Sequence, residues 1–85
     1  MTVITITKEN ATVKEIRRTM RSLESFHETL IIEGWGQIRK TGKTYSHGPL
    51  PEFDDSDPMT DYTAWTYGWR ESWLIDDIKR SLQIA

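Results

Sequence analysis

The fold predicted for this chain is decided by the stretch Ala64-Trp65-Thr66-Tyr67-Gly68-Trp69-Arg70-Glu71-Ser72-Trp73. It holds three of the four tryptophans of an 85-residue protein, and aromatic side chains of this size dominate the energetics of cores and interfaces. Trp65, Trp69 and Trp73 recur at every fourth position, which is the spacing of one face of a helix. The stretch therefore predicts a C-terminal helix over about 61–83 that carries an aromatic ridge.

The predicted C-terminal helix also carries an aliphatic ridge, formed by Ile75, Ile78 and Leu82. A helix that rests on one core needs a single apolar stripe. Two ridges predict that the helix is covered from two sides, or that it breaks near Trp73. The second cover is the chain itself, a second copy or another protein. Stacking of the tryptophans on nucleic-acid bases is a further use of the aromatic ridge.

The length and composition indicate one small domain, residues 1–85, which is marginally stable without additional support. The sequence has no cysteine, so neither a disulfide nor a thiolate metal site supplies that support. Aromatic packing or association into a homodimer is therefore expected. No apolar run is long enough to span a bilayer, and the first residues lack a secretory pattern, so we expect a cytoplasmic protein without a membrane partner.

The net charge is −2, and it is unevenly distributed along the chain. Residues 1–44 hold eight Lys or Arg and five Glu, whereas residues 45–85 hold three Lys or Arg and eight Asp or Glu. A net acidic protein is not a general polyanion binder, because nucleic-acid affinity comes largely from cations that displace phosphate counterions. A local contact with nucleic acid through the basic half is compatible with this distribution.

The N-terminal half begins with a short predicted strand over 3–7, in which Ile4 and Ile6 share one face. A single strand is unstable in water, so it needs a partner strand from this chain or from a second copy. Thr12 and Glu15 have the spacing of a capping box, which predicts the start of a helix. The apolar stripe of that helix comprises Val13, Ile16, Met20, Leu23 and Phe26.

This helix is predicted over about 12–28 and, with a kink at Gly34–Gly36, extends to about 41, where Thr41-Gly42 ends it. Leu30-Ile31-Ile32 followed by two glycines is also strand-like, since glycine disfavours a helix interior. Residues 43–60 form a long loop with three prolines and an acidic run. The predicted fold class is mainly α, a helical hairpin with a short N-terminal β-strand. The alternative is a small α+β domain with a strand at about 29–33.

Two segments share the order and spacing of a known family. The first is Glu33-Gly34-Trp35-Gly36-Gln37-Ile38-Arg39-Lys40-Thr41-Gly42-Lys43, and the second, after the proline-containing loop, is Ala64-Trp65-Thr66-Tyr67-Gly68-Trp69-Arg70-Glu71. Together they resemble the ribosome modulation factor family, in which a Gly-aromatic helix ends in Gly-Lys and the last helix carries a Trp-x-x-Gly-Trp-Arg-Glu motif. The resemblance covers about residues 33–73 and leaves residues 1–32 outside it.

The resemblance implies a helical hairpin over residues 33–85 that binds the ribosome near ribosomal RNA and promotes its dormancy. The residues that it marks as the structural motif are Gly34, Trp35, Trp65, Gly68, Trp69 and Arg70. On a helix, Trp65 and Trp69 would clamp two helices together beside the space left by Gly68. The motif predicts a packing role and no reaction.

Two groups of basic residues are candidates for contacts with phosphates or with a partner protein. The first lies opposite the apolar stripe of the predicted N-terminal helix and comprises Lys14, Arg17, Arg18 and Arg21. The second comprises Arg39, Lys40 and Lys43. Cations grouped in this way can bind phosphates or an acidic surface, and the alternative is a solvated helix face.

No catalytic, metal or cofactor site is expected. The acidic run comprises Glu52, Asp54, Asp55, Asp57 and Asp61, but it lacks the glycine and the final glutamate of an EF-hand loop. His27 lies within the apolar stripe of the predicted helix, where we expect a hydrogen-bonded core histidine. His47 is a candidate acid or base, but the sequence supplies it with no nucleophile and no orienting carboxylate.

The sequence therefore predicts a small non-enzymatic regulatory protein, with the ribosome or ribosomal RNA as its partner and with no small-molecule substrate. The alternative is a phage- or mobile-element-type inhibitor or adaptor that binds a host protein through aromatic and charged surfaces.

Overall fold

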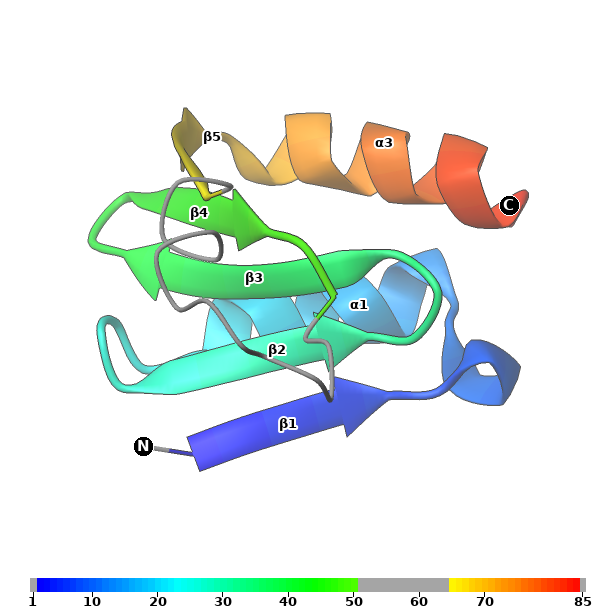
Figure 1. Ribbon diagram of the computed structural model, residues 1–85, viewed down its shortest axis with the longest axis horizontal. Coiled ribbons are helices and arrows are strands. Elements are labelled where there is room, and N and C mark those ends of the chain that lie inside the picture. Colours follow the sequence, from blue (N-terminus) through cyan, green and yellow to red (C-terminus); the bar gives the residue numbers. More distant parts are fainter. Residues whose placement is uncertain (1, 51–64, 85) are drawn as a thin grey trace, which may run out of the picture.

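The structure is a computed structural model that describes residues 2–50 and 65–84 (Figure 1). Within these residues the elements are β1 (Thr2–Ile6), η1 (Lys8–Asn10), α1 (Val13–Ser22), β2 (Glu28–Ile32), β3 (Gly36–Thr41), β4 (Thr44–Gly48), β5 (Thr66–Trp69) and α3 (Glu71–Leu82). The element η1 is a short 3-10 helix. The fold class is α+β, and the predicted mainly α hairpin is wrong.

The five strands form one mixed sheet in the order β1-β2-β3-β4-β5. β1 and β2 are parallel, because the segment that contains α1 carries the chain back between them, and the later pairs are antiparallel. Short turns connect β2 to β3 and β3 to β4, and Gly34 and Gly42 have φ angles of 85° and 72° in them. The pairing of β4 with β5 contains a register shift between Tyr45 and His47.

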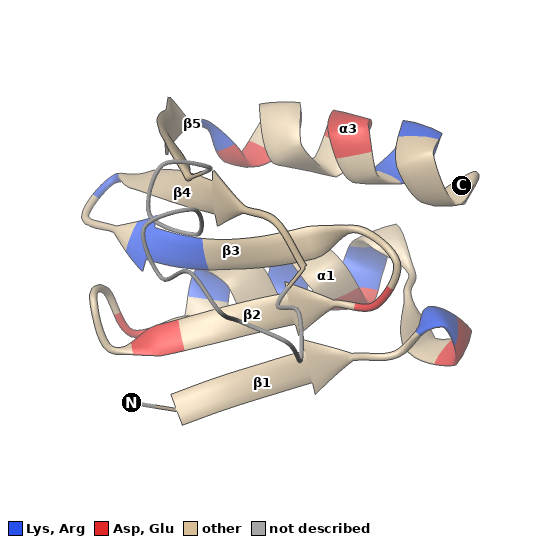
Figure 2. Ribbon diagram, viewed as in Figure 1, with Lys and Arg blue, Asp and Glu red and all other residues tan. Residues whose placement is uncertain are grey.

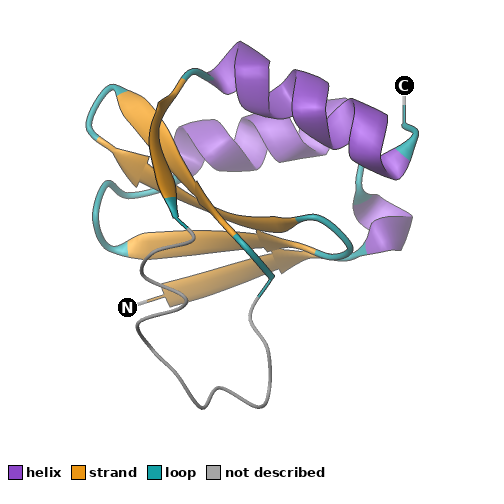
Figure 3. Ribbon diagram, turned by 45° about the horizontal axis from the view of Figure 1, so that its top comes forward, coloured by secondary structure: helices purple, strands orange, loops and turns teal. Residues whose placement is uncertain are grey.

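Both helices pack on one face of the sheet, so the core lies between two layers (Figures 1 and 3). The residues that fill it include Ile16 and Met20 of α1, Leu74 and Ile78 of α3, and Leu30, Ile32 and Ile38 of the sheet. No described helix lies over the opposite face, which we call the uncovered face. Among the described residues, no helix combines the length and the apolar character required to cross a membrane.

Two predictions for the N-terminal half are confirmed. The predicted first strand is β1, with Ile4 and Ile6 packed on the core, and its partner is β2 of the same chain. Thr12 caps α1, since its hydroxyl accepts a hydrogen bond of 3.2 Å from the backbone N–H of Glu15. The carboxylate of Glu15 pairs with Arg18 of the same helix.

The predicted continuation of the first helix to residue 28 or 41 is wrong. α1 ends at Ser22, and Leu23 already has extended backbone angles. The alternative strand at about 29–33 is confirmed as β2, because its β-branched and leucine side chains fit a sheet that is buried on one face. Thr41-Gly42 belongs to the β3–β4 hairpin and ends no helix.

The predicted helix over 61–83 is wrong in its first part. Residues 61–64 lie outside the described residues, Thr66–Trp69 form β5, and α3 begins only at Glu71. Gly68 has a φ of 79°, which is incompatible with a right-handed helix. The tryptophans therefore do not form one helical ridge, and the predicted clamp of two helices is absent from the described structure.

Candidate functional site

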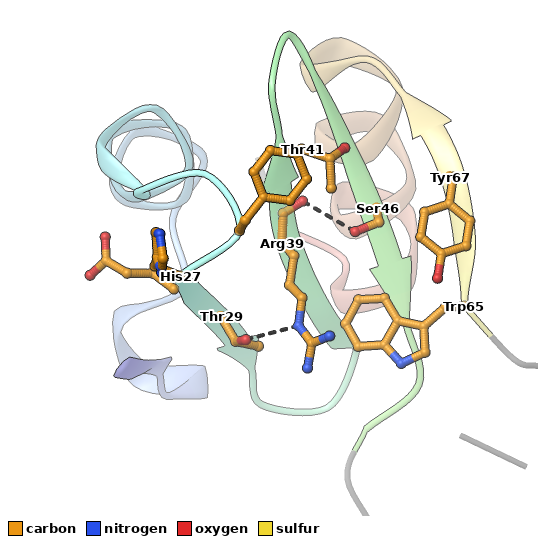
Figure 4. A pocket seen from close by; sticks show the side chains of 9 residues that line it. His27, Thr29, Arg39, Thr41, Ser46, Trp65 and Tyr67 are labelled. Carbon is orange, nitrogen blue, oxygen red and sulfur yellow. Dashed lines mark hydrogen bonds between the residues drawn. The ribbon is translucent and has the colours of Figure 1, made fainter. Parts of the chain in front are cut away.

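A groove of about 230 Å³ lies on the uncovered face of the sheet, between the start of β2 and the segment that leads into β5 (Figure 4). Its walls are formed by Phe26, His27, Glu28, Thr29, Arg39, Thr41, Ser46, Trp65 and Tyr67. Three of these side chains are large aromatics, and one is an arginine. We call it the aromatic groove.

Arg39 and Trp65 lie side by side in the aromatic groove. Cζ of Arg39 is 4.5 Å from the centroid of the indole, within the range of a cation–π interaction. Nε of Arg39 donates a hydrogen bond of 3.0 Å to the hydroxyl of Thr29, which is almost fully buried. The guanidinium is thus held in one orientation from two sides, and its terminal N–H groups are the donors that a ligand can use.

Trp65 can lie against β4 because position 48 is glycine. A Cβ atom at Gly48 would come within 2.6 Å of Cζ2 of the indole, far inside van der Waals contact. Ser46 lies two residues before Gly48, on the same face of β4. It is buried, and its hydroxyl donates a hydrogen bond of 3.4 Å to the carbonyl of Arg39. The small residues of β4 therefore leave the room that the indole occupies.

Phe26 and Tyr67 present large aromatic surfaces at the rim of the groove, where they are 69% and 64% exposed. Phe26 has a φ of 67°, a conformation that costs a bulky residue on the order of 1–3 kcal/mol. Its backbone N–H donates a hydrogen bond of 3.0 Å to the carbonyl of Lys40, which fastens the turn to β3. A strained backbone that holds an aromatic ring in solvent makes Phe26 a candidate binding residue.

A second aromatic cluster lies on the core side of the sheet, next to α3. His47 stacks on Trp35 with ring centroids 4.1 Å apart, and it meets Trp69 edge-on at 5.7 Å. Nε1 of Trp35 donates a hydrogen bond of 2.8 Å to the carboxylate of Asp77 on α3. Burial lowers the pKa of His47, and the carboxylate of Asp77 partly opposes this effect. The cluster joins β4 to α3 and has a packing role.

The residues of the family resemblance are divided between these two places and the turns. Trp35 and Trp69 belong to the core-side cluster, Trp65 belongs to the aromatic groove, and Gly34 lies in the β2–β3 turn. Gly68 lies in β5, and Arg70 precedes α3, where its guanidinium lies 5.3 Å from the ring of Trp73.

Basic residues recur along α1 (Figure 2), and side-chain ion pairs with acidic neighbours partly neutralise them. Arg18 pairs with Glu15, and Arg21 donates two hydrogen bonds to the carboxylate of Glu71 on α3. Arg17 lies 4.0 Å from the same carboxylate. The hydrogen bond from Arg21 is the main cause that lowers the pKa of Glu71.

The two predicted basic groups do not form one surface. Arg39 faces the aromatic groove, whereas the next residue, Lys40, reaches the helix layer and donates a hydrogen bond of 3.4 Å from Nζ to the carbonyl of Arg21. Lys43 is exposed in the β3–β4 turn, and Lys14 is exposed on α1. Of the seven candidates, Arg39 alone lines the groove.

Sequence reasoning missed Phe26, Thr29, Ser46 and Tyr67 as groove residues. One local signal points to Tyr67: with Trp65 it has the two-residue spacing by which side chains share one face of a strand. Phe26 instead fitted the apolar spacing of the predicted helix, and it lies in a turn because that helix ends earlier. For the same reason His27 is exposed, so its prediction as a core histidine is wrong.

Within residues 2–50 and 65–84, no three His, Asp or Glu side chains gather closely enough to hold a metal ion. The acidic run, from Glu52 to Asp61, lies outside the described residues. Compared with known proteins, the chain matches no family model, no curated protein and no solved structure.

Proposed function

We propose that this protein is a non-enzymatic regulatory protein that binds unpaired bases of RNA in its aromatic groove. The observation that carries the proposal is the pairing of a fixed arginine, Arg39, with Trp65, with the exposed rings of Phe26 and Tyr67 at the rim. Proteins recognise single-stranded RNA by stacking its bases on aromatic side chains and on guanidinium planes. The described residues of this sheet face present both kinds of group, which supports this mode of binding.

Each component of the groove has a role in this proposal. An unpaired base stacks on an aromatic ring at the rim, and the terminal N–H groups of Arg39 bind a phosphate or a base edge. Glu28 also lines the groove, but its carboxylate accepts a hydrogen bond of 2.7 Å from the backbone N–H of Glu24. This bond holds in place the one carboxylate among the described residues that line the groove.

The resemblance to the ribosome modulation factor family supports ribosomal RNA as the source of the bases. The part of that resemblance that enters the groove is Trp65, the first residue of its Trp-x-x-Gly-Trp-Arg-Glu motif. The proposal does not depend on the helical hairpin that the resemblance implied, because the groove is built from the sheet.

The proposal predicts that affinity for RNA depends only weakly on salt concentration. Single-stranded nucleic acid contributes a slope of roughly −0.7 for each phosphate contacted. The arginines of α1 are paired with carboxylates, and Arg39 is the one Lys or Arg among the described residues that line the groove. Binding that instead uses the whole basic face of α1 has a much steeper slope, so a salt titration distinguishes the two surfaces.

Fluorescence anisotropy with a short labelled single-stranded RNA of mixed sequence tests the proposal. Tyr67→Ala is expected to weaken binding by about 5- to 150-fold, because it removes an exposed ring at the rim and one base–aromatic stack contributes about 1–3 kcal/mol. Trp73→Ala is the matched control. Trp73 is also an exposed aromatic residue and lies next to an arginine, Arg70, but it does not line the groove. Failure of the wild-type protein to bind RNA, or equal losses in the two variants, contradicts the proposal.

The second candidate is a protein partner, as in a phage-type inhibitor or adaptor of a host protein. The net charge of −2 and the pairing of the α1 arginines with carboxylates favour it over an extended RNA contact. Aromatic and arginine side chains are also the usual anchors of protein interfaces. Recovery of one stoichiometric protein from nuclease-treated lysate, lost in Trp65→Ala, favours this candidate; loss of the partner after nuclease treatment favours RNA.

A further inference from the structure

β1 forms one edge of the sheet and has the composition of an unprotected edge strand (Figure 1). Its residues are Thr2, Val3, Ile4, Thr5 and Ile6, all of which are β-branched. Natural proteins protect an edge with charged residues, proline or a bulge, because an open edge is a template for another strand. β1 has no charge and no proline, its register with β2 is unbroken, and within the described residues it pairs with β2 alone.

The hydrogen bonds of β1 show which of its backbone groups point away from the sheet. The N–H of Thr2 donates to the carbonyl of His27, and the carbonyl of Ile6 accepts from the N–H of Glu33. In a parallel ladder the N–H and C=O of one residue point to the same side, and this side alternates along the strand. Thr2, Ile4 and Ile6 therefore face β2, whereas the backbone groups of Val3 and Thr5 point outward.

From this arrangement we propose that β1 pairs with β1 of a second copy, antiparallel, about a two-fold axis at Ile4. Val3 then lies opposite Thr5 of the second copy, and Thr5 lies opposite Val3. Each of these two pairs exchanges two N–H···O bonds. The four hydrogen bonds together satisfy the outward N–H and C=O groups of Val3 and Thr5 in both copies. Ile4 lies opposite itself as the close, non-hydrogen-bonded pair between them.

The chemistry of the strand favours a second copy over an unrelated peptide. The outward backbone groups are symmetric about Ile4, so the strand is complementary to itself, and no like charges meet. Val3, which is 55% exposed, gains an apolar contact with Thr5 on the uncovered face. Ile4 is half-buried at the edge of the core, and in the dimer the side chain of Ile4 of the second copy buries it further. Closed two-fold dimers are the commonest oligomers of soluble proteins.

The proposed dimer has one continuous sheet of ten strands, with all four main helices on one side and both aromatic grooves on the other. This inference is independent of the ligand of the groove. If the groove binds RNA, one strand of RNA can occupy two grooves of the same dimer, and its affinity rises through effective concentration.

Sedimentation velocity of the full chain over a range of concentrations tests the dimer, and paired charge variants test its register. Val3→Lys/Thr5→Lys and Val3→Glu/Thr5→Glu each place like charges opposite one another, and each is expected to raise the Kd of the homodimer by about 10- to 30-fold. An equimolar mixture restores a dimer, because positions 3 and 5 of opposite charge then meet. Val3→Thr/Thr5→Val is the matched control that exchanges the two side chains and keeps the dimer.

Hydrogen exchange on the wild-type chain provides a second test that needs no variant. The amides of Val3 and Thr5 are expected to be protected only at concentrations at which the dimer forms, whereas the amides of Ile4 and Ile6 are protected at all concentrations. A wild-type chain that stays monomeric overturns the proposal. A dimer with unprotected Val3 and Thr5 amides, or one that both charge variants leave intact, also overturns it, and shows a different interface.

Discussion

Gly48 decides where the indole of Trp65 lies, so its substitution separates the groove from the rest of the fold. Gly48→Ala places a methyl group inside the space of the indole. We expect the free energy of unfolding to fall by about 1–3 kcal/mol, the usual cost of overpacking. We also expect weaker binding of single-stranded RNA, because the indole must move away from Arg39. Urea denaturation measures the first effect, and fluorescence anisotropy measures the second.

Gly42→Ala is the control for this prediction. Gly42 has a φ of 72°, and a Cβ atom there has no neighbour within 4 Å. The substitution is expected to cost about 1–2 kcal/mol through the left-handed backbone alone, and to leave RNA affinity unchanged. Wild-type RNA affinity in Gly48→Ala would mean that the position of the indole is irrelevant to binding.

Single residues of the groove were only partly predictable. The sequence marked Arg39 as a phosphate contact and Trp65 as a packing residue, but nothing local to either position indicates that they touch. Their contact depends on β3, β4 and the segment before β5 lying side by side, which joins residues far apart in the chain. Thr29 and Ser46 are visible only once that register is known.

At the scale of elements, the start of α1 depends on the hydroxyl of Thr12. Thr12→Ala removes the acceptor for the backbone N–H of Glu15 and is expected to lower the free energy of unfolding by about 1 kcal/mol. Thr12→Ser keeps the hydroxyl and is expected to cost much less. Thermal denaturation of both variants checks the prediction; an equal loss in the two would assign the effect to the methyl group and not to the cap.

Local signals predicted some elements and failed for others. β1 and the N-terminus of α1 were found because β-branched alternation and a capping residue are local features. The end of α1 carries no glycine or proline, and the apolar residues after it fit the period of a helix as well as that of a strand. The spacing of the tryptophans also fits a helix, but Thr66–Trp69 pair with β4 as a strand, and the positive φ of Gly68 excludes a right-handed helix there.

At the scale of the whole molecule, groups in both layers set the pH dependence of stability. Burial lowers the pKa of His47 from its usual 6.5, so the unfolded chain takes up this proton at a higher pH than the folded protein does. The free energy of unfolding is therefore expected to fall as the pH decreases from 6.5 towards the folded pKa. Hydrogen bonds from Arg21 and Arg18 lower the pKa values of Glu71 and Glu15 from 4.5. The contributions of these two carboxylates to the free energy of unfolding are expected to be lost as the pH falls further, through their pKa values in the folded protein.

Urea denaturation at a series of pH values checks this profile, and His47→Gln assigns its upper part. The variant keeps a planar polar side chain between Trp35 and Trp69 but cannot titrate. It is expected to lose the decrease that begins near pH 6.5 and to keep the decrease at acidic pH. An unchanged upper decrease in the variant would assign it to a different group.

The architecture as a whole was beyond what the sequence alone could predict. A sheet is defined by pairings between strands, and here β5 reaches β4 across residues 51–64, which lie outside the described part of the chain. The two apolar ridges of the C-terminal segment predicted either a helix covered from two sides or a break near Trp73. The structure shows a break, since β5 ends at Trp69 and α3 begins at Glu71. α3 in fact buries Leu74, Ile75 and Ile78 on one side, while Trp73 remains about half exposed.

The parallel pairing of β1 with β2 has a consequence for the order of folding. β2, β3 and β4 are joined by short turns and can zip together with little loss of chain entropy. β1 can join only after the whole α1 segment has been closed into a loop, since Thr2 pairs with Glu28. Loop closure therefore favours early assembly of β2, β3 and β4. In any species that lacks β1, the Leu-Ile-Ile run of β2 lies in the outermost strand, where it can pair with another chain.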